Sequence, residues 1–260
     1  MKIRIRFTKT GTMQYIGHLD LMRYFQKLFR RCGFDVSYSQ GFNPHQLMSF
    51  ASPLGLGVTT VADYLDVSLE SFVVTNSSGD GMVGNTLSVE EWIDRINSYS
   101  NKMVTVTGIY VLKDDAKPSM SLLSATSYVV YGLTEEYVKG IVDYYNNSDS
   151  IIYVKQTKKS SKEIDLKQGF MVVAGGYDKY AELSDRYTIR DAEYEELMAK
   201  DDKALYLLCH SGSDNNIKPD MLLEAYSKYI EPEKEFNKYS FDIVRTDMFY
   251  GSDRYISMAL

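Results

Sequence analysis

The chain has 260 residues, enough for one large domain or two small ones, each with its own hydrophobic core. Its hydrophobic fraction of 44% is ordinary for a globular protein, and no apolar run reaches the roughly 18 residues that a membrane-spanning helix needs. Cys32 and Cys209 are far apart and form no paired motif. This fits a protein of the reducing cytoplasm and excludes a Cys-x-x-Cys iron–sulfur site on the chain itself.

The charge is unevenly distributed along the chain. The net charge is −6, but residues 1–61 hold eight Lys and Arg against two acidic residues, so this segment carries +6 and the remainder −12. A basic segment on an acidic protein indicates a local anionic partner and argues against indiscriminate nucleic-acid binding. The alternative is a set of solvated charges without a ligand.

The first half of the chain predicts strands and helices in the order β-α-β-β-α-β. Alternating apolar residues predict strands, and a 3.6-residue apolar period, a capping box at Ser88 and the helix stop Gly33 predict two helices. The predicted strands cover 2–7, 34–38, 62–69 and 103–112, and the predicted helices cover 18–32 and 88–98. The long stretch 39–61 is too apolar for disorder, so we expect an ordered functional loop there.

The second half predicts the same order of elements after a linker over 114–121. The predicted strands cover 128–131, 151–155, 204–209 and 241–249, and the predicted helices cover 134–145 and 219–230. An insertion over 157–202 contains a further predicted acidic helix over 191–200. The expected fold is therefore an α+β protein of two tandem ferredoxin-like (βαββαβ) units, with long connections between the second and third strands. The expected domains are residues 1–116 and 117–260.

A glycine motif at 79–84 matches G-x-G-x-x-G, which is a weak signal for dinucleotide binding. The predicted helix begins only at Ser88, after the motif, and residues 100–106 contain no acidic residue for a ribose. We interpret the segment as a loop.

Two histidines are the candidates for chemistry. His18 and His45 are each able to act as a general acid or base near neutral pH, although a histidine often only hydrogen-bonds a loop. His18, Asp20 and His45 do not have a spacing that indicates a metal site, and Asp20 is explained by the dipole of the helix that it begins. No metal site is predicted.

The candidate nucleic-acid-binding residues come from three segments. On the first strand, Lys2, Arg4 and Arg6 alternate with apolar residues, so they point away from the helices onto the open sheet face. The other candidates are Phe42, Asn43 and His45 in the 39–61 loop, and Lys158, Lys159 and Lys162 in a lysine-rich arm. The charges of the first helix, Arg23, Lys27 and Arg30, lie on its outer face and are expected to be solvated.

Asp66 provides the alternative interpretation of the strand charges. It lies on the neighbouring predicted strand, where it could neutralise Arg4 or Arg6 instead of leaving them to a ligand.

The sequence resembles the bacterial "radical SAM-linked protein" family, whose members are encoded beside, or fused behind, an uncharacterised radical SAM protein. The matching text is RFTK at 6–9, YIGHLD at 15–20, SQGFNPH at 39–45 and SFASPLGLG at 49–57. Weaker likeness continues in KEID at 162–165, GSDNNIKP at 212–219 and RT at 245–246. Residues 70–102 and 170–202 depart from the pattern, so their roles stay open.

The resemblance implies a partner that carries the iron–sulfur cluster and S-adenosylmethionine, with no cofactor on this chain. The family has no assigned reaction, so it supplies no catalytic residues. We expect a non-catalytic, substrate-presenting partner of a radical SAM enzyme, directed to RNA, with no membrane partner. One alternative is a metal-independent RNA endonuclease that uses His18 or His45. The other is a protein-interaction module that never binds nucleic acid.

Overall fold

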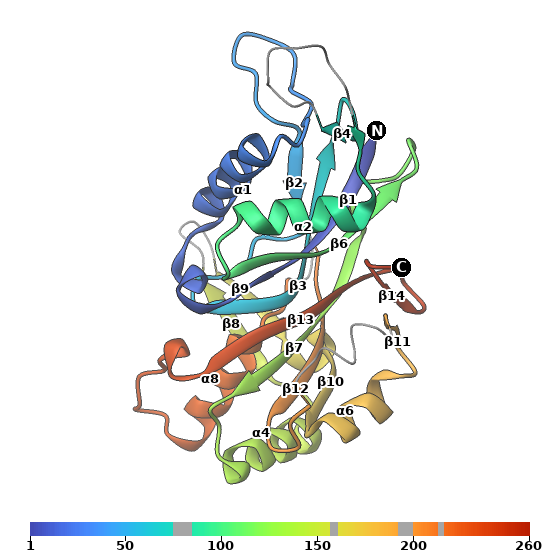
Figure 1. Cartoon of the computed structure of the whole chain (residues 1–260). Helices are drawn as coiled ribbons and strands as arrows, with labels where there is room; N and C mark the ends of the chain where they lie inside the picture. Colours follow the sequence, from blue (N-terminus) through green and yellow to red (C-terminus); the bar gives the residue numbers. More distant parts are fainter. Residues whose placement is uncertain (75–84, 157–160, 192–199, 213–215) are drawn as a thin grey trace. The chain divides into compact units, whose positions relative to one another are not determined.

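The computed structural model describes residues 1–74, 85–156, 161–191, 200–212 and 216–260 (Figure 1). The chain divides into two compact units, an N-terminal unit (Met1–Leu122) and a C-terminal unit (Leu123–Met258), with Ala259 grouping with the first and Leu260 with the second. Each unit combines helices with a β-sheet, so the chain is a mixed α/β protein. The glycine motif at 79–84 and most of the predicted helix 191–200 lie outside the described residues.

The sheet of the N-terminal unit has the strand order β2-β3-β1-β6, and all of its pairings are antiparallel. The strands are β1 (Lys2–Lys9), β2 (Met48–Phe50), β3 (Val58–Ser68) and β6 (Val104–Leu112). Because side chains alternate along β1, Ile3, Ile5 and Phe7 enter the hydrophobic core and Lys2, Arg4 and Arg6 point to the other face.

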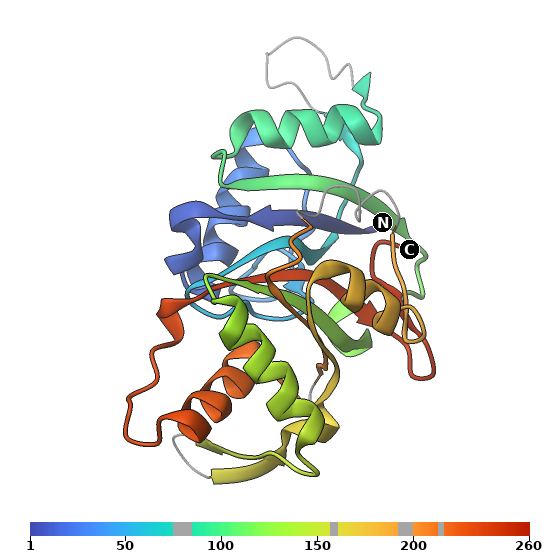
Figure 2. The same cartoon turned by 90° about the horizontal axis from the view of Figure 1, so that it is seen from below.

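Two helices cover the core face of this sheet, α1 (His18–Cys32) and α2 (Val89–Tyr99) (Figure 2). Leu21, Phe25 and Leu28 of α1 form the predicted apolar stripe, and α1 ends at Gly33 in the left-handed conformation that glycine adopts without strain. The predicted capping box of α2 is confirmed, because Ser88 Oγ accepts from Glu91 N–H and Glu91 Oε2 accepts from Ser88 N–H. Shorter elements complete the unit: η1 (Gly11–Tyr15), β4 (Val73–Val74), β5 (Asn85–Thr86) and α3 (Ser119–Leu122).

The C-terminal unit has a sheet in the order β10-β12-β7-β13-β14-β11, antiparallel except for the β14–β11 pair. Its strands are β7 (Leu123–Tyr131), β10 (Phe170–Gly175), β11 (Thr188–Ile189), β12 (Leu205–His210), β13 (Asp242–Tyr250) and β14 (Tyr255–Ser257). A separate hairpin consists of β8 (Ile152–Gln156) and β9 (Ser161–Asp165).

The helices of the C-terminal unit are α4 (Glu135–Asn147), α5 (Leu166–Gly169), α6 (Tyr177–Ser184) and α8 (Pro219–Ile230), with the 3-10 turn η2 (Lys238–Ser240) before β13. Helices α4 and α8 pack against each other through stacked tyrosines, with Tyr144 and Tyr229 ring centroids 4.6 Å apart. Pro219 begins α8, as predicted, because a missing N–H has no cost at the first helical position.

Two strand predictions are wrong. Residues 34–38 do not form a strand and make only the isolated bridges Val36–Leu69 and Tyr38–Gln46, while β2 lies inside the predicted loop 39–61. In the C-terminal unit the predicted strand 151–155 forms the separate β8–β9 hairpin. The strand that pairs with β12 in the sheet is β10, which lies inside the predicted insertion 157–202.

Candidate functional site

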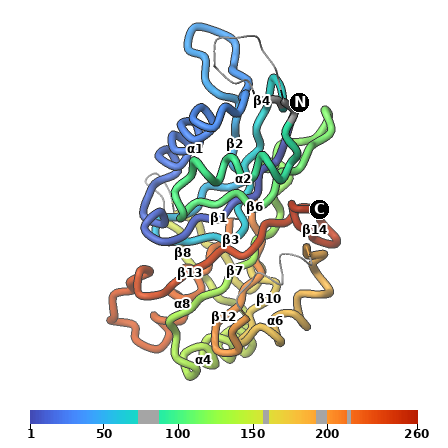
Figure 3. The backbone as a smooth tube through the Cα atoms, in the orientation of Figure 1, coloured from blue at the N-terminus to red at the C-terminus, as the bar shows by residue number. Residues whose placement is uncertain are grey.

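A hairpin loop projects from the N-terminal unit between α1 and β2 (Figure 3). Ser39 N–H donates to the His45 carbonyl at 2.8 Å and Leu47 N–H donates to the Ser37 carbonyl at 2.8 Å, so residues 37–47 pair as two short arms. Gly41 has a φ of 118°, which a residue with a side chain rarely adopts, and it allows the tight loop between the arms. The hydrogen bonds show that the loop predicted to be ordered is closed by its own backbone.

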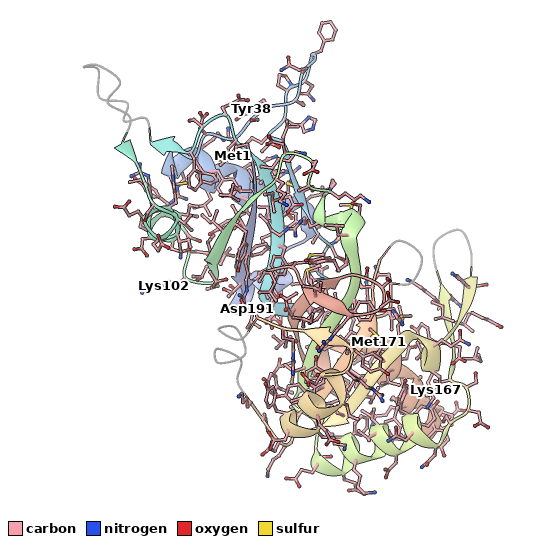
Figure 4. The ribbon with its side chains drawn as sticks, turned by 90° about the vertical axis from the view of Figure 1, so that its right-hand side faces the viewer. Met1, Tyr38, Lys102, Lys167, Met171 and Asp191 are labelled. Carbon is pink, nitrogen blue, oxygen red and sulfur yellow. The ribbon has the colours of Figure 1, made fainter. Side chains whose placement is uncertain are left out.

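The tip of this hairpin presents apolar side chains to solvent. Phe42 is fully exposed, with a relative accessibility of 111%, and Tyr38 and Leu47 are also exposed. Figure 4 shows Tyr38 and Met1 at the end of the unit from which the hairpin projects. The ring of Phe42 makes no contribution to the hydrophobic core, and it is accessible to a ligand that approaches the tip.

Beside the hairpin lies a cleft of about 250 Å³, formed entirely by residues of the N-terminal unit. We refer to it as the β1–β3 cleft. Its walls come from the second hairpin arm with β2, from the ends of β1, β3 and β6, and from the segment that follows β6. The lining residues are Lys2, His45, Gln46, Leu47, Met48, Ser49, Asp66, Val67, Ser68, Leu112, Ala116, Lys117 and Pro118.

The β1–β3 cleft includes groups from the sheet face that the helices leave uncovered. Val67 points into the helix-covered core, so its strand neighbours Asp66 and Ser68 point to the opposite face, where Lys2 also points. Lys2 Nζ donates to the Asp114 carbonyl at 3.2 Å, which holds the lysine beside the segment after β6. Lys2 and Lys117 are both exposed and are the cationic groups of the lining.

Arg4 is held inside the unit rather than offered to a ligand. Arg4 Nε donates to Asp66 Oδ1 at 2.8 Å, and the two side chains are 6% and 14% exposed. Asp66 Oδ2 also accepts from Ser119 N–H at 2.6 Å. Asp66 therefore neutralises Arg4 in the structure, as in the alternative interpretation in which the strand charges do not bind a ligand.

Arg6 is as buried as Arg4, with 5% of its surface exposed. Of the three strand cations on this face, only Lys2 is therefore accessible. The predicted set of Lys2, Arg4 and Arg6 separates into one surface cation and two buried guanidinium groups.

The two candidate histidines lie in different surroundings. His45 closes the hairpin: Ser39 Oγ accepts from the His45 backbone N–H at 3.1 Å and lies 2.8 Å from His45 Nδ1. The His45 side chain lines the β1–β3 cleft and is exposed. His18 begins α1 and packs edge-on against Phe50 at 5.2 Å between ring centroids. The structure does not place His18 in the lining of the cleft.

The remaining predicted residues fall in three places. Asn43 is exposed in the hairpin loop beside Phe42. Lys162 lies on β9 of the C-terminal unit and is exposed, whereas Lys158 and Lys159 lie outside the described residues.

The outer face of α1 carries the charges that were predicted to be solvated. Arg23 and Asp20 form an exposed ion pair at 3.2 Å within α1, and Arg30 Nε donates to the Gln26 carbonyl. These contacts are local to one helix, which is typical of a solvated surface.

Residues 2–219 match a family described as an uncharacterized protein conserved in bacteria, DUF2344. The chain belongs to this family. The DUF2344 match includes the hairpin and every residue that lines the β1–β3 cleft, and it ends at the first residue of α8. No curated protein matches the chain.

Sequence reasoning missed Gln46 and Lys117. Gln46 adjoins the predicted residue His45, but nothing in the sequence signals that the amide becomes buried while its neighbours stay exposed. Lys117 lies in the segment that we predicted to be a linker. This segment packs beside the start of β1, where Lys2 Nζ donates to the Asp114 carbonyl, and this packing places Lys117 in the lining of the cleft.

A larger cavity of about 570 Å³ lies in the C-terminal unit between α4, β10 and α6. Its lysines are already engaged at the surface: Lys203 pairs with Glu135 at 2.6 Å, and Lys179 pairs with Glu182 at 2.9 Å. The β1–β3 cleft is therefore the better candidate, because its lysines make no ion pair with any described residue.

The described residues contain no group of three or more His, Cys, Asp and Glu side chains that could hold a metal ion. Both cysteines are buried free thiols. Burial raises the pKa of the Cys32 thiol to about 11 and that of the Cys209 thiol to about 12, which keeps both protonated at neutral pH. Within the part of the chain that the structure describes, no helix is both long enough and apolar enough to span a membrane.

Proposed function

We propose that this DUF2344 protein is a non-catalytic binding protein that presents single-stranded RNA to a radical SAM enzyme. The observation that carries the RNA part is the pairing of a projecting hairpin, tipped by the fully exposed Phe42, with a cleft whose accessible cations are Lys2 and Lys117. Proteins that bind single strands combine aromatic side chains, on which bases stack, with cations that follow the phosphates.

The sheet topologies support the predicted fold. In the N-terminal unit the strand order β6-β1-β3-β2, with two crossover helices on one face, is the order expected for a split βαβ unit. The order β13-β7-β12-β10 repeats it in the C-terminal unit. We therefore propose two ferredoxin-like units, an architecture that recurs among RNA-binding proteins and supports the RNA assignment by analogy.

The role of partner rests on the resemblance to radical SAM-linked proteins. In this proposal the iron–sulfur cluster and S-adenosylmethionine belong to the partner enzyme in the cytoplasm, and this chain supplies the substrate. Purification of the native complex, with the bound protein and RNA both identified, tests this part. Recovery of the chain without any radical SAM protein would remove the partnership.

The endonuclease alternative has one feature in its favour, since His45 lines the β1–β3 cleft. Against it, His45 is engaged within the hairpin, where its Nδ1 lies 2.8 Å from Ser39 Oγ and its backbone N–H donates to the same oxygen. Cleavage of RNA by the purified protein in the presence of chelator would establish this alternative, and His45→Gln would then abolish the cleavage.

The decisive experiment measures binding of short single-stranded RNA by fluorescence anisotropy at several salt concentrations. The double variant Lys2→Gln/Lys117→Gln should bind more weakly and show a shallower log–log salt dependence, by about 0.7 for each phosphate that is no longer neutralised by a lysine. The matched control is Arg23→Gln/Lys27→Gln on the outer face of α1, which should bind like the wild type. No binding by the wild-type protein at any salt concentration would favour the protein-interaction alternative.

A further inference from the structure

Three lysines from separate segments of the C-terminal unit converge beside the β8–β9 hairpin. Lys155 on β8 and Lys162 on β9 are directly opposite in the antiparallel register, so their side chains lie on the same face of the hairpin. Lys155 Nζ donates to the Asn216 carbonyl at 3.4 Å, which places it beside the segment that leads into α8. Lys218 is the N-cap residue of α8 and belongs to that segment. We refer to Lys155, Lys162 and Lys218 as the lysine cluster.

Strand alternation places the lysine cluster on the side of the hairpin that faces α8. Tyr153 lies two residues before Lys155 on β8, and its hydroxyl donates to Glu224 Oε2 of α8 at 2.7 Å. Residues two apart on a strand share a face, so Lys155 also points toward α8. Lys162 is exposed, and Lys155 and Lys218 are partly buried. The cluster is therefore open to a ligand from solvent.

The positive charges of the lysine cluster are not balanced by carboxylates. None of the three lysines forms an ion pair with a described residue, and Glu163 follows Lys162 on β9 and so points to the opposite face. Burial lowers the pKa of Lys155, and the charges of Lys218 and Lys162 lower it further. Asp220 of α8 opposes this lowering without cancelling it. Because like charges directly opposite on two strands repel, an anion bound among the three lysines would stabilise the arrangement.

We propose that the lysine cluster binds a phosphate group, which in the proposed function belongs to the backbone of single-stranded RNA. Each lysine is a compact charge with three N–H donors, and three of them from different directions suit the several oxygens of one phosphate. Lys162 and Lys218 belong to the KEID and GSDNNIKP segments, which the fold brings together here. The RNA source of the phosphate rests on the proposed function, whereas the phosphate site itself does not.

The phosphate has two possible sources, a free phosphate compound or an RNA strand. The test therefore titrates the wild-type protein with inorganic phosphate and pyrophosphate by calorimetry, and with short single-stranded RNA by fluorescence anisotropy. Tighter binding of RNA than of either free compound is expected, because a strand makes further contacts. Binding of the free compounds without RNA supports the phosphate site and overturns the proposed RNA function. No binding of any of these probes overturns both.

The variant Lys162→Glu separates binding from folding. It places a carboxylate directly opposite Lys155, which is a favourable cross-strand pair, so the thermal midpoint should stay the same or rise. The affinity for RNA should nevertheless fall by about 10-fold or more, as expected for the loss of one charge-assisted contact. Lys155→Arg keeps the charge and should bind within about 3-fold of the wild type. The matched control is Lys102→Glu, the same charge reversal at an exposed lysine of the N-terminal unit, which should change neither property.

Three outcomes overturn the lysine cluster as a phosphate site while leaving RNA binding by the wild-type protein intact. RNA binding by Lys162→Glu with wild-type affinity would show that the cluster does not contact the strand. Equal losses of affinity in Lys162→Glu and Lys102→Glu would indicate diffuse attraction to positive charge. A thermal midpoint of Lys162→Glu that falls in step with its affinity would make the cluster a structural feature of the hairpin.

Discussion

Arg4 and Asp66 form a nearly buried ion pair across β1 and β3, with Arg4 Nε 2.8 Å from Asp66 Oδ1. The carboxylate is shared, because its other oxygen accepts from Ser119 N–H. The Asp66 carboxylate therefore links strands β1 and β3 to the segment that follows β6. The charge of Arg4 therefore contributes to the fold of the N-terminal unit, and the accessible charge beside it is that of Lys2.

The first prediction concerns this ion pair. Arg4→Gln should lower the free energy of unfolding by about 3–5 kcal/mol, because it leaves the Asp66 carboxylate buried without its cation. Urea denaturation measures the change, and Lys2→Gln is the control at the same end of the same strand. Lys2→Gln should change the stability by less than about 0.5 kcal/mol, as surface substitutions usually do. A stable Arg4→Gln variant that no longer binds RNA would instead make Arg4 a ligand-binding residue.

The sequence predicted α1, α2, α4 and α8 because their signals are local, but it missed α6 inside the predicted insertion 157–202. The apolar stripe of α1, the capping box at Ser88 and Pro219 at the start of α8 are each confirmed. The direction of Arg4 was also predictable, since alternation along a strand fixes the face. Whether the Arg4 guanidinium is exposed to solvent or paired with Asp66 depends on the register between β1 and β3 and on which segment packs over that face of the sheet. The sequence of one strand does not determine either.

The error in the C-terminal unit has a physical cause. Residues 151–155 are rich in β-branched and aromatic residues, which favours a strand, but Ile152 and Val154 are exposed on the β8–β9 hairpin. β10 is also a short continuous apolar run, which periodicity alone does not distinguish from a buried helix segment. Local patterning predicts that a strand forms, but long-range pairing decides which sheet it joins.

The second prediction tests the tip of the hairpin. Phe42→Ala should weaken the binding of single-stranded RNA by about 1–3 kcal/mol, the usual contribution of one stacked base. Stability should be unchanged, because the fully exposed ring makes no contribution to the core. The control is Tyr239→Ala, which removes an exposed aromatic ring from the C-terminal unit. Equal effects from both variants would indicate nonspecific attraction to aromatic surface.

The third prediction is a pH dependence of stability caused by His210. Burial lowers the pKa of His210 below its ordinary value of 6.5. The His210 imidazole therefore binds a proton less tightly in the folded chain than in the unfolded chain. Proton binding then favours the unfolded state, and stability should fall as the pH decreases below about 6.5. His210→Gln should make this decrease shallower in urea titrations between pH 7 and 5. Tyr255→Phe, which removes only the Tyr255 hydroxyl 3.4 Å from His210 Nδ1, should keep the wild-type slope.

The last prediction concerns the two thiols. Cys32 and Cys209 are completely buried, and burial raises their pKa values to about 11 and 12. A thiol reagent at pH 8 should therefore leave both unmodified in the folded protein and modify both in urea, with the rate following the unfolded fraction. Above pH 9 the unfolded chain ionises its thiols first, so their burial should lower stability as the pH rises, and Cys32→Ala/Cys209→Ala should reduce that decrease. Rapid modification of either cysteine without urea would show that its part of the core opens in the native protein.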